Sequence, residues 1–109
     1  MALDVPEAVA AYLAAEQAKD AEALSRCFTE DGTVHDEGHD YRGRESIRQW
    51  KQAMDVKYRY MLEPLNVRAD EGEVTVRARL TGEFPGSPAM LRYRFTLGDG
   101  AIARLEISA

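Results

Sequence analysis

The sequence has one cysteine, no long hydrophobic run and no excess of basic residues, and each absence excludes a class of protein. Cys27 alone cannot form an internal disulfide or a cysteine-based metal cluster. No apolar stretch approaches the roughly 20 residues that a membrane-spanning helix needs. The net charge of the 109 residues is -5, and both nucleic acid and anionic membranes favour a basic surface. We therefore expect neither as a partner.

The chain also lacks a linker, an internal repeat and a low-complexity tract. Its opening residues, Met-Ala-Leu-Asp-Val-Pro, do not have the basic stretch and apolar run of a secretion signal. With 45% hydrophobic residues, a chain of this length can bury a core without disulfides or metals. We expect a single domain over residues 1–109 in a reducing, cytoplasmic setting.

The first quarter of the chain has the spacing of two helices. Asp4, followed three residues later by a glutamate, matches a capping box and predicts a helix from about Val5, with Tyr12 on its buried side. Asp20 can cap a second, shorter helix, which we expect to end at residues 29–32.

A third helix of about four turns is expected from Arg44 to Val56. Four residues recur at helical spacing and should point inward: Ile47, Trp50, Ala53 and Met54. The remaining positions are polar and should form a solvent-exposed face: Arg44, Glu45, Arg48, Gln49, Lys51 and Gln52.

The second half of the chain alternates apolar and polar residues with the period of β-strands. A strand over residues 57–69 changes phase at Pro64, which predicts a bulge there. Further strands are expected over residues 74–81, 90–97 and 101–107, the last two joined by a hairpin at Gly98-Asp99-Gly100. The sequence thus predicts an α+β fold, in which N-terminal helices pack on one face of a mainly antiparallel sheet.

Asp36 is the first candidate for a functional group. It lies two residues after Val34 in a short β-favouring run, so the two side chains should project from the same face of a strand. A carboxylate among apolar side chains is costly unless it is paired or protonated, which favours a chemical or structural use. The alternative remains open that Asp36 caps a turn by accepting bonds from the backbone of residues 38–39.

Five short segments have a characteristic order and spacing: Tyr12 with Lys19-Asp20, Phe28 to Asp36, Tyr41 to Ile47, Tyr93-Arg94-Phe95, and Asp99 to Ile102. Together they resemble the nuclear transport factor 2-like superfamily, in particular its small SnoaL-like members. The resemblance implies a cone-shaped fold, in which a curved sheet wraps a long helix and encloses an apolar pocket. Because the superfamily includes ketosteroid isomerases, polyketide cyclases, dehydratases and non-catalytic domains, it leaves open whether this protein is an enzyme.

The similarity to ketosteroid isomerase is partial. Tyr12 falls at the position of that family's oxyanion-hole tyrosine, and Asp36 falls at its general base. Leu91 stands where the isomerase has a protonated aspartate. Loss of one oxyanion-hole donor can cost about 3 kcal/mol of transition-state stabilisation, so steroid isomerisation itself is not expected.

The resemblance leads to a hypothesis of acid–base chemistry on a small hydrophobic carbonyl compound. Asp36 would remove a proton next to the carbonyl, and the Tyr12 hydroxyl would donate to the developing enolate oxygen. The expected pocket residues are Trp50, Tyr58, Leu91 and Phe28. Two alternatives remain, a domain that binds such a molecule without turnover and a dimerisation domain. Tyr12 can equally be an ordinary core residue, and a tryptophan such as Trp50 is more often a core residue than a ligand platform.

His35 and His39 are separated by acidic residues but do not have the spacing of a metal site. In an extended chain they stand about 13 Å apart, and His35 points away from Asp36. We expect both histidines at the surface, and neither a metal nor a cofactor.

Four arginines fall on the sheet face opposite the apolar one: Arg77, Arg79, Arg92 and Arg94. The resembling superfamily commonly pairs subunits through this outer face, where arginines can bond Glu83 or Glu106 of a partner. We therefore expect a homodimer through the outer face of the sheet rather than a polyanion-binding patch.

Overall fold

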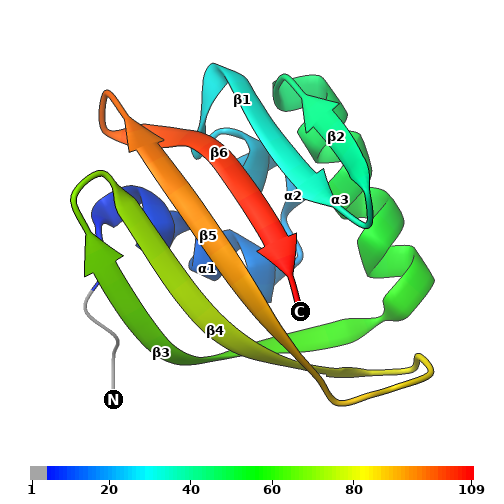
Figure 1. The fold of residues 1–109 in the computed structure, drawn as a ribbon. Helices are drawn as coiled ribbons and strands as arrows, with labels where there is room; N and C mark the ends of the chain where they lie inside the picture. Colours follow the sequence, from blue (N-terminus) through cyan, green and yellow to red (C-terminus); the bar gives the residue numbers. More distant parts are fainter. Residues whose placement is uncertain (1–4) are drawn as a thin grey trace.

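A computed structural model describes residues 5–109 of the protein. The chain forms three helices and six strands within this range (Figure 1). Their bounds, in chain order, are α1 Glu7–Ala18, α2 Ala21–Ser25, β1 Phe28–Asp36, β2 His39–Arg42, α3 Arg44–Tyr58, β3 Tyr60–Asp70, β4 Glu73–Gly82, β5 Ala89–Gly98 and β6 Ala101–Ser108. The fold is therefore α+β, as the sequence predicts.

The six strands form one curled sheet in the order β2-β1-β6-β5-β4-β3. Strands β3 to β6 make the predicted antiparallel meander, and β1 joins it by pairing in parallel with β6. All three helices lie on one side of the sheet, behind it in Figure 1. The long helix α3 lies beside β1 and β2, and α1 crosses behind the middle strands.

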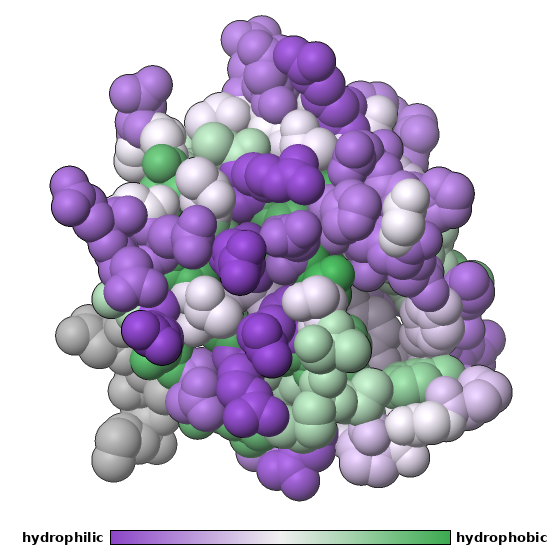
Figure 2. Space-filling model, in the orientation of Figure 1, coloured by the Kyte–Doolittle hydropathy of each residue, from purple (hydrophilic) through white to green (hydrophobic). Residues whose placement is uncertain are grey.

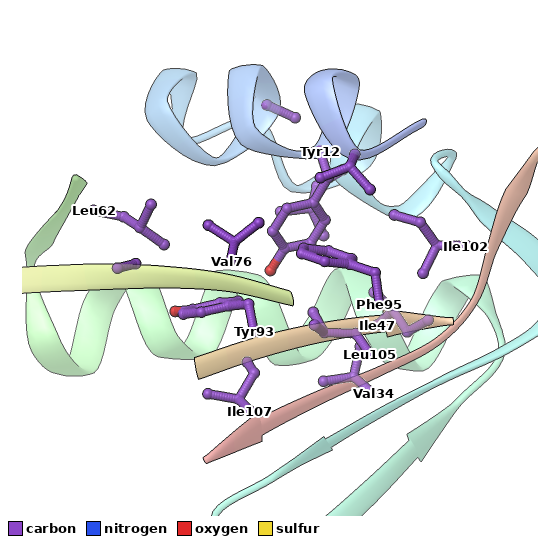
Figure 3. Packing of buried hydrophobic residues seen from close by; sticks show 14 of the residues in the cluster. Tyr12, Val34, Ile47, Leu62, Val76, Tyr93, Phe95, Ile102, Leu105 and Ile107 are labelled. Atoms are coloured by element: carbon purple, nitrogen blue, oxygen red, sulfur yellow. The ribbon is translucent and has the colours of Figure 1, made fainter. Parts of the chain in front are cut away.

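The core fills the space between the helices and the inner face of the sheet. Tyr12 reaches from α1 to the aromatic rings of β5, with its ring centroid 5.1 Å from that of Phe95 and 6.5 Å from that of Tyr93 (Figure 3). Apolar residues that alternate along β4 to β6 complete the layer, as expected for a sheet buried on one face only. This layer fixes where α1 and β5 meet.

The start of the chain differs from the expectation. Helix α1 begins at Glu7 with Pro6 at its N-cap, two residues later than predicted, and Asp4 of the proposed capping box lies outside the described residues. Asp20 caps α2 as predicted, since its side chain accepts a bond from the backbone N–H of Ala23 at 3.0 Å.

Residues 29–32 were expected to end the second helix, but they are part of strand β1. The register of β1 against β6 shifts between Phe28 and Thr33, so this stretch bulges away from regular pairing. The side chain of Arg44 holds the beginning of the strand by donating two bonds to the carbonyl of Phe28, at 3.1 and 3.0 Å. A prediction from the turn-favouring residues alone therefore places the start of β1 too late. The strand is stabilised by the side chain of Arg44 and by parallel pairing with β6, which are distant along the chain.

Helix α3 extends to Tyr58, and β3 begins only at Tyr60, so Tyr58 lies on the helix and not in the predicted strand. Arg59 ends the helix in the left-handed conformation. Strand β4 passes so close to this corner that a side chain at Gly82 would lie 2.8 Å from the Arg59 carbonyl oxygen. The predicted bulge in β3 is confirmed, with a register shift between Pro64 and Asn66.

Two residues of α3 face the opposite way from the prediction. Lys51, expected in solvent, is completely buried, and Ala53, expected in the core, is exposed. Lys51 is buried because its ammonium forms an ion pair with the carboxylate of Glu16 on α1. The polarity of lysine alone predicts an exposed position and does not indicate such a partner. The apolar side of α3 is therefore formed chiefly by Ile47 and Trp50, and a charged residue lies next to them.

The outer face of the sheet is turned toward the viewer in Figure 2, and hydrophilic side chains cover most of it. Hydrophobic side chains show between them, mainly in the lower half of this view. Among residues 5–109, no helix is both long enough and apolar enough to cross a membrane.

Candidate functional site

A cavity of about 510 Å³ opens between α3, the ends of the sheet strands and the loop between β4 and β5. Its volume is within the range of small-molecule sites. The side chains and backbone that line it are those of Asp36, Glu37, Gly38, Trp50, Met54, Tyr58, Tyr60, Leu80, Phe84, Pro85, Ala89, Leu91, Tyr93, Ile107, Ser108 and Ala109. Three of the four expected pocket residues, Trp50, Tyr58 and Leu91, are among them.

Asp36 is the last residue of β1 and lies on the wall of this cavity. The next two residues, Glu37 and Gly38, have positive φ angles of 52° and 79°, the geometry of a tight two-residue hairpin turn that glycine favours. Trp50 on α3 donates a hydrogen bond from its indole nitrogen to Asp36 Oδ2 at 3.1 Å. A turn and a neighbouring helix thus fix the carboxylate at the cavity.

The environment of Asp36 disfavours its charge. Burial raises the pKa of the Asp36 carboxyl above its ordinary value, and the nearby charge of Glu37 adds to this effect. The bond from Trp50, a backbone bond from Glu37 and the charge of His35 act in the opposite direction but do not cancel it. A raised pKa together with an ionisable group in a cleft is typical of functional carboxylates, although structural ones also have it.

Tyr12 and Phe28, the other two expected site residues, do not line the cavity. Both are fully buried in the core, and their rings contact each other edge to face with centroids 6.1 Å apart. The Tyr12 hydroxyl has no hydrogen-bond partner among the described residues. Tyr12 therefore belongs to the core and not to the cavity wall, because α1 packs it against the aromatic residues of β5.

Two other tyrosines, which the sequence analysis did not name as site residues, reach the cavity. Tyr93 on β5 and Tyr60 at the start of β3 both line it, and both are almost fully buried. Burial raises the pKa of both phenols, as do the charges of Glu16 for each and of Asp36 for Tyr93. Their inward alternation along the strands was visible in the sequence, but core and cavity positions give the same pattern.

The rim of the cavity joins three separate segments. The Tyr58 hydroxyl at the end of α3 donates to Glu37 Oε2 in the β1–β2 turn at 2.6 Å. The ring of Tyr58 also meets that of Phe84, from the β4–β5 loop, edge to face with centroids 5.7 Å apart. These contacts hold the turn, the helix end and the loop around one opening.

The histidines lie away from the cavity lining. His35 Nδ1 is 2.7 Å from Asp40 Oδ1, and the ring of His39 lies 6.5 Å from that of Tyr41. Residues 5–109 bring no group of three or more histidine, cysteine, aspartate or glutamate side chains into an arrangement that could hold a metal ion.

The four arginines of the outer sheet face are all exposed, and two of them form ion pairs within the chain. Arg79 lies 3.2 Å from Glu63, and Arg94 lies 3.4 Å from Glu106, one of the glutamates expected to bond a partner's arginine. Arg77 and Arg92 stand directly opposite each other on β4 and β5 and border the same shallow groove. Two like charges in this position repel unless an anion lies over them.

Comparison with known proteins agrees with this fold. The family model described as "SnoaL-like domain" matches residues 9–105. The chain belongs to the SnoaL-like domain family. A crystal structure of a "putative polyketide cyclase" from Sinorhizobium meliloti is 43% identical to this SnoaL-like domain, covers 96% of both chains and superposes with a TM-score of 0.93.

Two further structures resemble the SnoaL-like domain. A protein of ketosteroid isomerase-like fold from Catenulispora acidiphila, solved in complex with trimethylamine, is 25% identical over 97% of this chain and 87% of that chain, with a TM-score of 0.85. A "putative polyketide cyclase" from Xanthomonas campestris is 24% identical over 92% of this chain and 85% of that chain, with a TM-score of 0.77, which supports the fold alone. No curated protein shows significant similarity to the chain.

Proposed function

We propose that this SnoaL-like domain is an enzyme of the isomerase, cyclase or dehydratase kind, with Asp36 as its general base. The observation that carries the proposal is the partly buried Asp36 carboxylate on the wall of a cavity lined mainly by aromatic and aliphatic side chains, fixed there by the indole of Trp50. The raised pKa of Asp36 supports the role, because a base with a higher pKa removes a proton more readily. The description of the 43% identical Sinorhizobium meliloti protein as a "putative polyketide cyclase" agrees with it.

The substrate class follows from the lining of the cavity. Aromatic and aliphatic side chains make up most of it, and its volume suits a small hydrophobic molecule. In the proposed step the C–H bond next to a carbonyl breaks, Asp36 takes the proton, and the electron pair moves onto the carbonyl oxygen. Asp36 then returns the proton to the same or another carbon, so the step needs no external acid.

Tyr93 takes the part that the resemblance gave to Tyr12, that of the hydrogen-bond donor to the enolate oxygen. Tyr93 lines the cavity, which Tyr12 does not, and burial, followed by the charges of Glu16 and Asp36, raises the pKa of its phenol. A phenol with a raised pKa stays protonated and can donate a bond to an anionic oxygen. Leu91, two residues earlier on the same strand face, offers only apolar contact.

Hydrogen exchange on a simple ketone tests this proposal without the natural substrate. We expect the protein to speed deuterium incorporation next to the carbonyl of 2-tetralone in D₂O, followed by proton NMR. Asp36→Asn should abolish the acceleration, and Tyr93→Phe should reduce it more than Tyr12→Phe does. Glu45→Gln is the matched control, since it removes an exposed carboxylate of α3 outside the cavity lining and should retain exchange. Equal rates for Asp36→Asn and the unaltered protein would reject the base role.

Binding without turnover is the second candidate. The C. acidiphila protein, whose fold is the same, was solved with a small molecule that undergoes no carbonyl chemistry. Leu91 also stands where ketosteroid isomerase has a hydrogen-bond donor. The lack of this donor favours binding of a ligand over its chemical conversion. A protein that binds 2-tetralone but leaves its exchange rate unchanged would favour this candidate.

A further inference from the structure

The charge of Asp36 has no cationic partner among residues 5–109. None of the ion pairs formed by residues 5–109 includes Asp36. Its bonds come from neutral donors, the indole N–H of Trp50 and the backbone N–H of Glu37. A partly buried carboxylate is usually paired, so an unmatched negative charge at a cavity wall can be balanced by what enters the cavity.

The rest of the cavity lining is also rich in groups that attract cations. Among the described residues, the cavity wall contains two carboxylate side chains, those of Asp36 and Glu37, and no lysine, arginine or histidine side chain. Five aromatic rings also line it: Trp50, Tyr58, Tyr60, Phe84 and Tyr93. The face of an aromatic ring attracts cations, and that of tryptophan does so most strongly. An anionic ligand would meet repulsion from these carboxylates, and no cationic side chain of the lining would offset it.

No lysine of the described residues belongs to the cavity lining, but three lie close to aromatic rings that do. Lys19 lies 4.1 Å from the centroid of the Tyr60 ring. Lys51 lies 4.9 Å from the centroid of the Tyr60 ring, but its charge is bound to Glu16 at 2.7 Å. Lys57, at the surface, lies 4.9 Å from the centroid of the Tyr58 ring. That leaves the region around Trp50 and Asp36 as the part of the cavity where a carboxylate and an indole adjoin without a positive charge.

We propose that the cavity selects small organic cations, and that its substrate carries an alkylammonium group that lies against Trp50 and beside Asp36. This inference adds a cationic group to the small hydrophobic carbonyl substrate of the proposed function, and it rests on the cavity being the ligand site. Tertiary and quaternary ammonium groups fit best, because their methyl groups contact aromatic rings while the charge interacts with the carboxylate.

Three probes of nearly the same shape test the charge preference. Choline carries a trimethylammonium head, 3,3-dimethyl-1-butanol has the same head with carbon in place of nitrogen, and 3,3-dimethylbutanoate is an anion of similar size. Trp50 is the sole tryptophan of the chain, so its fluorescence reports binding directly at the proposed site, with calorimetry as a second measurement. We expect choline to bind about tenfold or more tightly than the alcohol, and the anion to bind least.

Variants assign the preference to Asp36. Asp36→Asn should bring the affinity for choline down to that for the alcohol and leave alcohol binding unchanged. Glu45→Gln, which removes an exposed carboxylate from α3, should preserve the preference. Equal binding of choline and the alcohol by the unaltered protein, no binding of choline, or an unchanged preference in Asp36→Asn would each overturn the inference. The ketone exchange assay separates the two proposals, because Asp36-dependent exchange without a cation preference rejects only the substrate class.

Discussion

Replacing Lys51 by methionine tests the interpretation that a buried ionic cluster joins α1, α3 and β3. The Lys51 ammonium is fully buried and donates to Glu16 Oε1 at 2.7 Å, to Asp55 Oδ1 at 2.5 Å and to Tyr60 Oη at 3.0 Å. Glu16 is also fully buried, and its second oxygen has no partner among the described residues. Lys51→Met would therefore leave a carboxylate in the interior with no counter-charge.

Removal of one member of a buried pair typically costs about 3–5 kcal/mol of stability. That is a large part of the roughly 5–15 kcal/mol by which small domains are stable. Replacing both members by apolar residues of similar size is often neutral. We therefore expect Lys51→Met to be strongly destabilised, and the double variant Glu16→Leu with Lys51→Met to recover most of the loss. Asp55 keeps a partner in the double variant, since Lys19 lies 3.7 Å away.

Urea denaturation followed by circular dichroism measures these free energies of unfolding. Lys57→Met provides the matched control, because it makes the same change at an exposed position of the same helix and should leave stability nearly unchanged. A loss of less than about 1 kcal/mol in Lys51→Met would refute the reasoning, since a buried charge without a partner costs more. A double variant as unstable as the single one would refute it as well.

Three further predictions concern stability and assembly. Burial raises the pKa of Asp36 above its ordinary value of 3.8, so the ionised carboxylate destabilises the fold at neutral pH. Asp36→Asn should therefore raise the free energy of unfolding at pH 7, as measured by urea titration. This gain should vanish as the pH falls toward 3.8, where the carboxyl of the unfolded chain is also protonated. Tyr12→Phe removes a buried hydroxyl without a partner and should stabilise the protein by about 1–3 kcal/mol, whereas Tyr60→Phe, which loses the bond from Lys51, should destabilise it. We propose a homodimer through the outer sheet face, so Arg77→Glu combined with Arg92→Glu should yield monomers in light scattering.

Each of these predictions has an outcome that contradicts it. A stability gain in Asp36→Asn that is constant between pH 7 and pH 4 would show that the charge is not its cause. A loss of stability in Tyr12→Phe would mean that the hydroxyl is satisfied. An unchanged mass of the double arginine variant would exclude the outer sheet face as the interface. Arg26→Glu, at the C-cap of α2, controls for the change of charge.

The type and order of the helices and strands could be predicted from the sequence, because these depend on local periodicity. The alternating residues of β4, β5 and β6 gave three strands close to their observed bounds. The strand segment before Val34 could not be predicted from local pattern, because its residues favour a turn. A register shift and two hydrogen bonds from Arg44 keep these residues in the strand. Such support comes from residues that are distant along the chain.

The candidate site was predicted in part. The position of Asp36 at the end of a strand followed from its alternation with Val34, and the structure adds the bond from Trp50. The donor assigned by resemblance, Tyr12, lies in the core, while Tyr93 lines the cavity. Alternation indicates which face of a strand is inward, but it does not distinguish a packed core from an open cavity.

The sequence by itself determined the fold class, the course of the chain and the end of the strand that carries the carboxylate. Only the tertiary structure decided which charged residues are buried and which aromatic residues enclose the cavity. Lys51 and Glu16 are 35 residues apart, and each looks like a surface residue until the packing of α1 against α3 brings them within 2.7 Å. Burial of a charge depends on its partner, and no local pattern contains that partner.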